Sequence, residues 1–232
     1  MTESIERRMT RGAVELRAVD GTERRIGGYA AKFDKLSQNL GGFVERIQPG
    51  FFDKSRDAAW AGVMARYNHE LLLGTVSASS LRITLDDTGL DYEVDLLDDV
   101  ASERVLKLVE RGDVSQSSFA FYTYEDDWAM SPDGFPMRTL ISGKLVDVAP
   151  VDQPAYLDTS TGLRSLAVKH EMAEAEVRAL ADAGELSKIL TVAPVVIDLG
   201  GSDSDPEGRG ETCGPWERLH VMRRALEIEL AD

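Results

Sequence analysis

Hydrophobic and polar residues alternate with a period of two over much of the chain from residue 13 to residue 157. This period is typical of β-strands, in which successive side chains point to opposite faces of a sheet. Turn signals such as Asp20-Gly21 separate the alternating segments and predict antiparallel hairpins. The strands predicted in this way lie at residues 13–18, 25–33, 43–47, 63–70, 71–76, 81–85, 90–96, 119–124, 137–141 and 144–148.

Two segments of the same stretch have a helical rather than an alternating pattern. Residues 51–60 predict a short helix, and residues 102–111 predict a second one that stops at Gly112. The polar run 126–136 predicts a loop, and two prolines favour an extended conformation for residues 150–157. The pattern therefore predicts a mainly β fold of the α+β class, a closed and mostly antiparallel β-barrel with flanking helices.

The character of the chain changes after about residue 164. Residues 171–183 predict a helix, residues 200–215 have the composition of a flexible linker, and residues 216–230 predict a short amphipathic helix. That last helix fits either a surface element packed on the core or a docking peptide. We therefore expect a barrel domain at residues 1–164 and a helical and linker tail at residues 165–232.

Acidic residues outnumber basic ones by 41 to 26 in this 232-residue chain, which gives a net charge of −15. So acidic a chain repels nucleic-acid phosphates, and we expect no nucleic-acid partner. The single cysteine, Cys213, excludes an intrachain disulfide, and no cysteine–histidine cluster suggests zinc. No apolar run approaches the roughly 20 residues of a membrane span, and the polar first ten residues do not form a signal peptide. We expect a soluble intracellular protein with no membrane partner and no cofactor.

Residue types that hydrolases use occur in the predicted strands or at their ends. Ser117 and Ser118 precede the strand that begins at Phe119, where a hydroxyl would be held rigidly, although serine also favours strand ends for structural reasons. His69 closes a buried-looking strand, and in isolation a structural histidine is the better interpretation. Asp147 lies inside an apolar strand.

Together, His69, Ser118 and Asp147 have the composition of a hydrolase triad. Such a site needs a hydroxyl that can lose its proton, a base of near-neutral pKa, and an acid that fixes the tautomer of the base. Spacing alone does not show that the three side chains meet. An esterase of the α/β-hydrolase class is disfavoured, because the sequence contains no Gly-x-Ser-x-Gly motif.

Five blocks of sequence carry a more specific signal than this spacing. The blocks are Gly28–Ala30 with Phe33, Glu45–Phe52, Asn68-His69 with Leu73-Gly74, Asp113–Phe121, and Asp147–Val151 with Pro154–Tyr156. In these residues and in their order, the chain resembles the prohead (capsid maturation) protease family of tailed bacteriophages. The resemblance covers roughly residues 12–160, which is most of the predicted barrel.

This resemblance implies a fold and an activity. The family is similar to the assembly proteases of herpesviruses, which are closed β-barrels flanked by helices. It implies a serine endopeptidase, a hydrolase that cuts scaffold and major capsid protein inside the procapsid in the host cytoplasm, and then itself. Carried over residue by residue, Ser118 is the nucleophile, His69 the general base and Asp147 the third member.

The chain departs from the family pattern around these residues, and alternatives stay open. The serine block of the family usually reads Ser-Gly-Met-Ser-Phe-Gly-Phe, so the extra hydroxyl of Ser117 is an alternative nucleophile. The last block more often opens with glutamate than with an aspartate such as Asp147. The oxyanion donors are either backbone N–H groups near Ser118 or a loop arginine such as Arg138, and the arginine is the weaker candidate. A catalytically degenerate scaffolding protein of the procapsid is the alternative function, and a homo-oligomer is left open.

Overall fold

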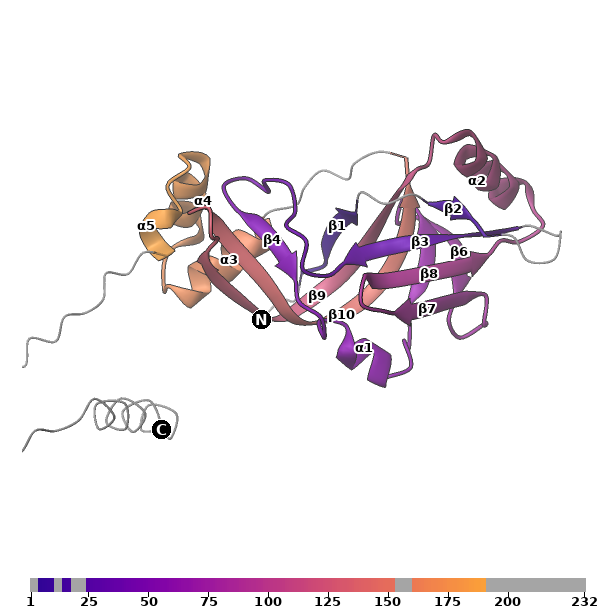
Figure 1. Ribbon diagram of the computed structural model, residues 1–232, viewed down its shortest axis with the longest axis horizontal. Helices are drawn as coiled ribbons and strands as arrows, with labels where there is room; N and C mark the ends of the chain where they lie inside the picture. Colours follow the sequence, from indigo (N-terminus) through magenta and orange to yellow (C-terminus); the bar gives the residue numbers. More distant parts are fainter. Residues whose placement is uncertain (1–3, 11–13, 18–23, 153–159, 191–232) are drawn as a thin grey trace, which may run out of the picture. The chain divides into compact units, whose positions relative to one another are not determined.

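The computed structural model describes residues 4–10, 14–17, 24–152 and 160–190, which all belong to one compact unit, and Figure 1 shows their arrangement. The strands in this part of the chain are β1 (Glu6–Thr10), β2 (Glu15–Leu16), β3 (Arg25–Lys32), β4 (Val44–Ile47), β5 (Met64–Tyr67), β6 (Leu71–Thr75), β7 (Leu81–Leu85), β8 (Gly89–Asp95), β9 (Gln116–Met130) and β10 (Pro136–Val151). The helices are α1 (Asp53–Asp57), α2 (Val100–Arg111), α3 (Ser160–Lys169), α4 (Glu174–Asp182) and α5 (Ser187–Leu190).

The strands form two sheets. One has the order β1-β9-β10-β5-β6, with β4 also paired to β10, and the other has the order β2-β3-β8-β7. Most pairs are antiparallel, but β10 runs parallel to β4 and to β5. The prediction of a strand-rich α+β fold with few helices is confirmed. Strand pairing within the described residues does not show a closed barrel, so closure stays a prediction.

The long antiparallel pair of β9 and β10 differs from the sequence prediction. We predicted a loop at 126–136, but β9 continues to Met130 and β10 starts at Pro136, so that only the tight turn between them is a loop. We also predicted two strands separated at Ser142-Gly143, but β10 is continuous there. The reason lies in packing: the Gly143 N–H donates to the Phe51 carbonyl oxygen at 3.0 Å, and the missing side chain leaves room for the Phe51 ring just before α1.

Strand β1 has no counterpart in the predicted elements. Its sequence is almost entirely polar, and the burial alternates, with Glu6 and Arg8 inside and Arg7 exposed. The inward residues are charged, so a search for alternating apolar residues does not find the strand. Their charges are paired inside the protein, as described below.

Two hydrophobic clusters hold the fold together. The larger draws on both sheets and centres on four phenylalanines: Phe51 packs edge-on against Phe52 and Phe121, with ring centroids 4.9 and 5.4 Å apart, and Phe119 stacks on Phe121 at 4.9 Å. Truncating one buried phenylalanine to alanine typically costs about 3–5 kcal/mol. The smaller cluster joins the far end of the β9–β10 pair to the helices, and its members include Phe43, Trp128, Leu163, Leu166 and Val177.

Helices α1, α2 and α4 agree with the predicted helices to within a few residues, whereas α3 and α5 were not predicted. Asp99 caps α2 by accepting from the Ser102 N–H at 2.7 Å, and Gly112 ends it with a left-handed φ of 85°. Helix α3 runs across residue 164, where we predicted a domain boundary, and the division at that residue stays a prediction. The predicted linker 200–215 and helix 216–230 lie outside the described residues.

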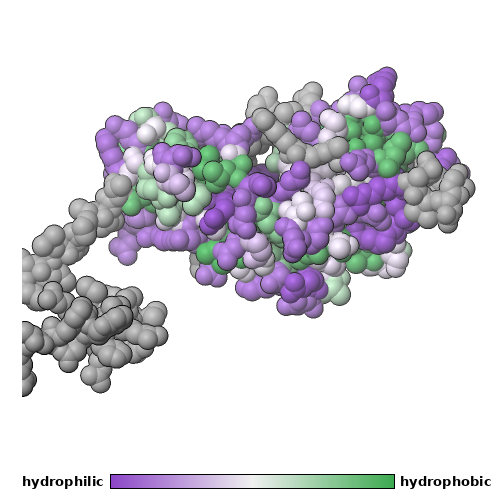
Figure 2. Space-filling model, viewed as in Figure 1, coloured by the Kyte–Doolittle hydropathy of each residue, from purple (hydrophilic) through white to green (hydrophobic). Residues whose placement is uncertain are grey.

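The visible face of the molecule in Figure 2 is largely hydrophilic, with hydrophobic areas over the α3–α5 helices and beside α2. None of the helices in the described ranges is long and apolar enough to cross a membrane.

Replacing Gly143 with alanine tests the close contact between β10 and Phe51, which lies just before α1. A Cβ at this position would lie 2.2 Å from Phe51 Cζ and 2.6 Å from the Tyr122 carbonyl oxygen. Gly143→Ala should therefore lower the free energy of unfolding by about 1–3 kcal/mol, as measured by urea denaturation. Ser142→Ala is the matched control and should change it by less than about 0.5 kcal/mol. A Gly143→Ala protein as stable as the parent would contradict the packing described here.

Candidate active site

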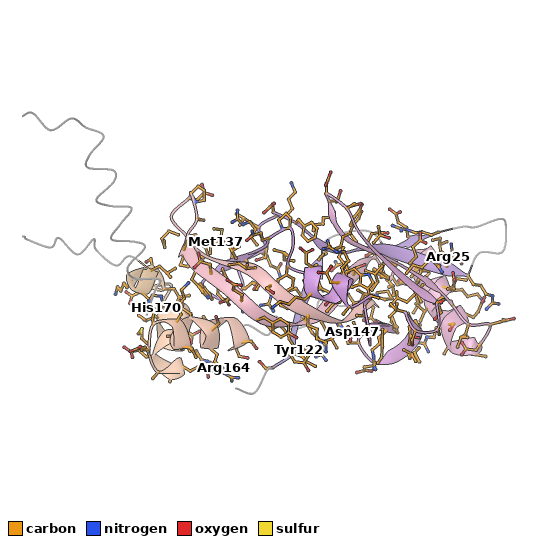
Figure 3. The ribbon with its side chains drawn as sticks, turned by 90° about the horizontal axis from the view of Figure 1, so that it is seen from below. Arg25, Tyr122, Met137, Asp147, Arg164 and His170 are labelled. Atoms are coloured by element: carbon orange, nitrogen blue, oxygen red, sulfur yellow. The ribbon has the colours of Figure 1, made fainter. Side chains whose placement is uncertain are left out.

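His69, Ser118 and Asp147 meet at one face of the β9–β10 pair. His69 Nε2 lies 2.7 Å from Ser118 Oγ, and His69 Nδ1 lies 2.6 Å from Asp147 Oδ1. Figure 3 shows Asp147 in the central part of the molecule, well away from His170 and Arg164 at the helical end. Residues that are 49 and 78 positions apart in the sequence are thus joined in one hydrogen-bonded chain.

Strand pairing places two of these side chains. Ser118 is directly opposite Ala149, and Ala120 is directly opposite Asp147. Residues that face each other across an antiparallel pair share a face of the sheet, as do residues two apart in one strand. The Ser118 hydroxyl and the Asp147 carboxylate are therefore fixed on one face by the backbone ladder itself.

The tight turn between β5 and β6 places the third side chain. Asn68 and His69 both have left-handed backbones, with φ of 53° and 62°. Asparagine and histidine adopt this conformation more readily than most residues with a side chain, and contacts with β10 hold the turn here. The Asn68 N–H donates to the Pro150 carbonyl oxygen at 3.1 Å, and the Asn68 side chain pairs with Asp152 at 3.0 and 3.2 Å. These bonds tie the turn to the end of β10, the strand that lies between β5 and the Ser118 strand β9.

The hydrogen-bond chain assigns a role to each nitrogen of the imidazole. A carboxylate can only accept, so Asp147 fixes the proton on Nδ1 and leaves Nε2 as the acceptor that faces Ser118. The side chains of His69 and Asp147 are 6% and 9% exposed, and this dry setting strengthens both hydrogen bonds. The arrangement can take a proton from the serine hydroxyl and stabilise the resulting imidazolium.

Ser118 Oγ has a second neighbour, the backbone carbonyl oxygen of Arg8 in β1, at 3.0 Å. A serine hydroxyl carries a single proton, so it donates to His69 or to this carbonyl, but not to both. While Nε2 is unprotonated, the two acceptors compete for that proton. When the ring is protonated, Nε2 donates to Oγ and the hydroxyl turns to Arg8. Ser118 itself is 0% exposed.

Ser117, the alternative nucleophile, lies elsewhere. Its hydroxyl is 3.3 Å from the Tyr92 hydroxyl, in the core between the two sheets. Burial raises the pKa of Tyr92 well above its ordinary value, so the phenol stays neutral. The structure brings Ser118, and not Ser117, to the imidazole.

Arg138 lies in a buried cluster of charged side chains that sequence reasoning missed. This β1 charge cluster consists of Glu6, Arg8, Glu45, Asp126 and Arg138. The Arg138 guanidinium donates to Asp126 at 2.6 Å, to Glu6 at 2.7 and 3.2 Å and to Glu45 at 3.1 Å, and Thr123 is at 3.5 Å. Its five N–H donors are all used there, which leaves none for an oxyanion. Arg138, the weaker candidate for an oxyanion donor, therefore serves to pair the acidic side chains of this cluster.

Glu6 is ionised in this cluster. Burial raises its pKa, but Arg138 and Arg8 outweigh burial, so the pKa falls below the ordinary value of 4.5. A carboxylate whose pKa is lower in the folded state stabilises the fold above its ordinary pKa and loses that contribution as the pH falls through the lower value. The cluster thus holds β1 in place at neutral pH. The only hint in the sequence was the spacing of Glu6 and Arg8, two residues apart.

No group of three or more histidine, cysteine, aspartate and glutamate side chains within the described ranges is arranged to hold a metal ion.

Comparisons with known proteins give two similarities. A family model described as caudovirus prohead serine protease matches residues 12–175 of the chain. Among solved structures, the bacteriophage T4 capsid assembly protease, gp21, is similar with a TM-score of 0.44 and 9% sequence identity, over 63% of this chain and 98% of that chain. The comparison with curated proteins gives no match.

The hydrogen bond between His69 and Asp147 can be tested without any assay of activity. A short hydrogen bond from an imidazole N–H to a carboxylate strongly deshields its proton. We expect one proton NMR signal far downfield of the amide region, and we expect Asp147→Asn to shift it upfield or abolish it. His170→Gln is the matched control and should leave the signal in place. A downfield signal that persists unchanged in Asp147→Asn would contradict the assigned pairing.

Proposed function

The chain belongs to the caudovirus prohead serine protease family, and on this premise we propose that it is a serine endopeptidase of phage head maturation. The observation that carries the proposal is the hydrogen-bonded chain Ser118–His69–Asp147, with distances of 2.7 and 2.6 Å. Nucleophile, base and orienting acid are the three parts that serine-protease chemistry needs.

In the proposed mechanism, Ser118 Oγ attacks the carbonyl carbon of the scissile peptide bond while its proton passes to His69 Nε2. His69 then gives this proton to the leaving amine as the C–N bond breaks, which leaves an acyl group on Ser118. Water attacks that ester by the reverse of the same steps and restores the serine. Asp147 holds the imidazole in the required tautomer and stabilises its positive charge.

The proposed substrates are the scaffold protein and segments of the major capsid protein inside the procapsid, in the host cytoplasm. The family description supports the prohead as the place of action. We also propose that the protein cuts itself in the segment after residue 164, so that the barrel domain at 1–164 is the protease and the tail at 165–232 is the processed part.

The alternative is a scaffolding protein with a degenerate site. A protein that no longer cleaves peptides has no need to keep two buried titratable side chains and a left-handed turn in register with a serine. The Asn68-His69 turn, which is tied to β10 and brings His69 to Ser118, therefore favours the enzyme over the scaffold.

Matched serine variants test the nucleophile. We expect Ser118→Ala to abolish cleavage when the chain is co-expressed with its neighbouring scaffold and capsid proteins and the mass of every product is measured. Ser117→Ala is the control: it loses one hydroxyl contact with Tyr92 and should still cleave. Circular dichroism and thermal unfolding of both variants should match the parent. Scaffold cleavage by a folded Ser118→Ala protein would overturn the assignment of Ser118.

Self-cleavage has its own test. The purified parent protein should lose mass on incubation, with new termini in the segment after residue 164, because linker-like sequence such as residues 200–215 is a good protease substrate. The Ser118→Ala protein should stay intact under the same conditions. A parent protein that digests scaffold while its own tail remains whole would contradict self-processing.

A further inference from the structure

A β-bulge in β10 turns Asp147 to the face of the sheet that carries the candidate active site. Leu145 lies opposite Phe121 of β9, and both side chains belong to the larger hydrophobic cluster. Asp147 is two residues further along β10, but it lies opposite Ala120, which is adjacent to Phe121. Val146 is thus an extra residue, and it breaks the alternation that would put Leu145 and Asp147 on the same face.

A regular ladder would place the wrong side chains at the site. If the pairing continued from Leu145 without a bulge, Val146 would lie opposite Ala120 and present an apolar side chain to the imidazole. Asp147 would then lie opposite Phe119, with its carboxylate turned toward the buried phenylalanines, where an unpaired charge is costly. The position of the bulge therefore decides whether the histidine has an orienting acid.

The chain just before α1 covers the edge of β10 near the bulge. β4 pairs with β10 at Met137–Leu140, and β5 pairs with it at Asp147–Val148. Between these two stretches, the Gly143 N–H donates to the Phe51 carbonyl oxygen at 3.0 Å. Figure 1 shows α1 beside this part of β10. The segment around α1 thus takes the place of a strand where β10 passes from one partner to the next.

The hydroxyl of Ser55 in α1 accepts a second N–H along this edge. Ser55 Oγ lies 2.9 Å from the backbone nitrogen of Leu145, the residue just before the bulge, and the bond is buried. Ser55 is 5% exposed. A buried N–H beside a bulge needs a partner because the ladder is locally disrupted there. A side chain that is 90 residues away in the sequence supplies this partner.

We propose that Ser55 is a positioning residue for the third member of the triad. By accepting from the Leu145 N–H, it holds the bulge in register and keeps the Asp147 carboxylate on the imidazole. This inference rests on the proposed function and adds to it a support that lies outside the two strands of the site. Ser55 acts through the backbone of β10 rather than on the substrate.

The closeness of the bulge to the carboxylate supports this role. One residue separates Leu145 from Asp147, so a shift of the Leu145 backbone is passed directly to the acid. The Asp147 carboxylate lies 2.6 Å from His69 Nδ1, a distance that leaves little tolerance. A misplacement of about 1 Å at an active site can cost about 10²-fold in rate. One hydrogen bond at the bulge can therefore have a large effect on the reaction.

The downfield proton NMR signal expected for the His69–Asp147 hydrogen bond tests the position of the acid without any assay of activity. Ser55→Ala removes the acceptor of the Leu145 N–H, so the signal should broaden or move upfield. Ser55→Thr keeps a hydroxyl at the same place and should preserve the signal of the parent. A structural role elsewhere in the core would not move this signal.

Ser131 provides a matched control. It is 6% exposed, and its hydroxyl likewise accepts a backbone N–H, that of Phe135 at 3.1 Å. It lies in the turn that joins β9 to β10, close in sequence to Met137, which Figure 3 shows well away from Asp147. Ser131→Ala removes the same kind of hydrogen bond and should leave the signal unchanged.

Scaffold cleavage measures the same coupling in the working enzyme. Ser55→Ala should lower kcat/KM about 10–100-fold in the parent background. In an Asp147→Asn background, it should lower kcat/KM by no more than about twofold, because the carboxylate through which Ser55 acts is already gone. A loss that came only from a weaker fold would be equally large in both backgrounds.

Folding is checked by circular dichroism and thermal unfolding of each variant. If Ser55→Ala does not fold, Ser55→Cys decides the question, because its thiol fills similar space and is only a weak acceptor. A Ser55→Cys protein that shows the parent signal and the parent kcat/KM would then overturn the inference.

The outcomes separate this inference from the proposed function. If folded Ser55→Ala keeps the parent signal, or if its loss of kcat/KM is as large beside Asp147→Asn, Ser55 does not position the acid, and the inference is overturned while the protease remains. If no protein cleaves scaffold but the signal changes as described, the proposed function fails and the positioning role stands. A parent protein without the signal would overturn the inference together with the assigned pairing.

Discussion

The antiparallel pairing of β9 with β10 is the constraint on which the site depends. It sets Ser118 opposite Ala149 and Ala120 opposite Asp147, and so fixes hydroxyl and carboxylate on one face before any side-chain contact is made. A slip of one residue would turn Ser118 into the core and bring Ser117 to the imidazole face. The stacked phenylalanines on the opposite face resist that slip, because it would expose Phe119 and Phe121. The same strand register therefore determines both the packing of the core and the geometry of the site.

On the other side of Ser118, strand β1 is held in place by the buried β1 charge cluster. Glu6 and Arg8 of β1 lie against Glu45 of β4 and Arg138 of β10, each almost inaccessible to water. Desolvating such groups costs several kcal/mol per ion, and the cluster recovers this cost only while every member is paired. Asp126 extends the network to α3 by accepting from Ser165 at 2.6 Å. The cluster therefore holds the polar strand β1 on the sheet through paired charges rather than through apolar packing.

Sequence reasoning reached the parts of the molecule that have an apolar period or a family motif. It found most strands, the capped helix α2 and the three side chains that meet at the site, although their catalytic roles stay a proposal. It missed β1, because the inward residues of that strand are charged, and it split β10 at Gly143, where a glycine serves close packing instead of a turn. It also could not show that Arg138 is buried among acidic side chains, because the fold determines which residues surround an arginine. In all three cases, contacts with residues that are distant in the sequence determine the local structure.

The central claim is that Ser118 and His69 act as one proton-transfer unit, and a double-mutant cycle on scaffold cleavage tests it most directly. Groups that work as a unit are strongly non-additive, so Ser118→Ala and His69→Ala should each lower kcat/KM by about 10⁴-fold or more, and the double variant should be no worse than either. All three proteins must unfold at the temperature of the parent. Losses that multiply in the double variant, or cleavage that survives in the folded Ser118→Ala protein, would contradict the account.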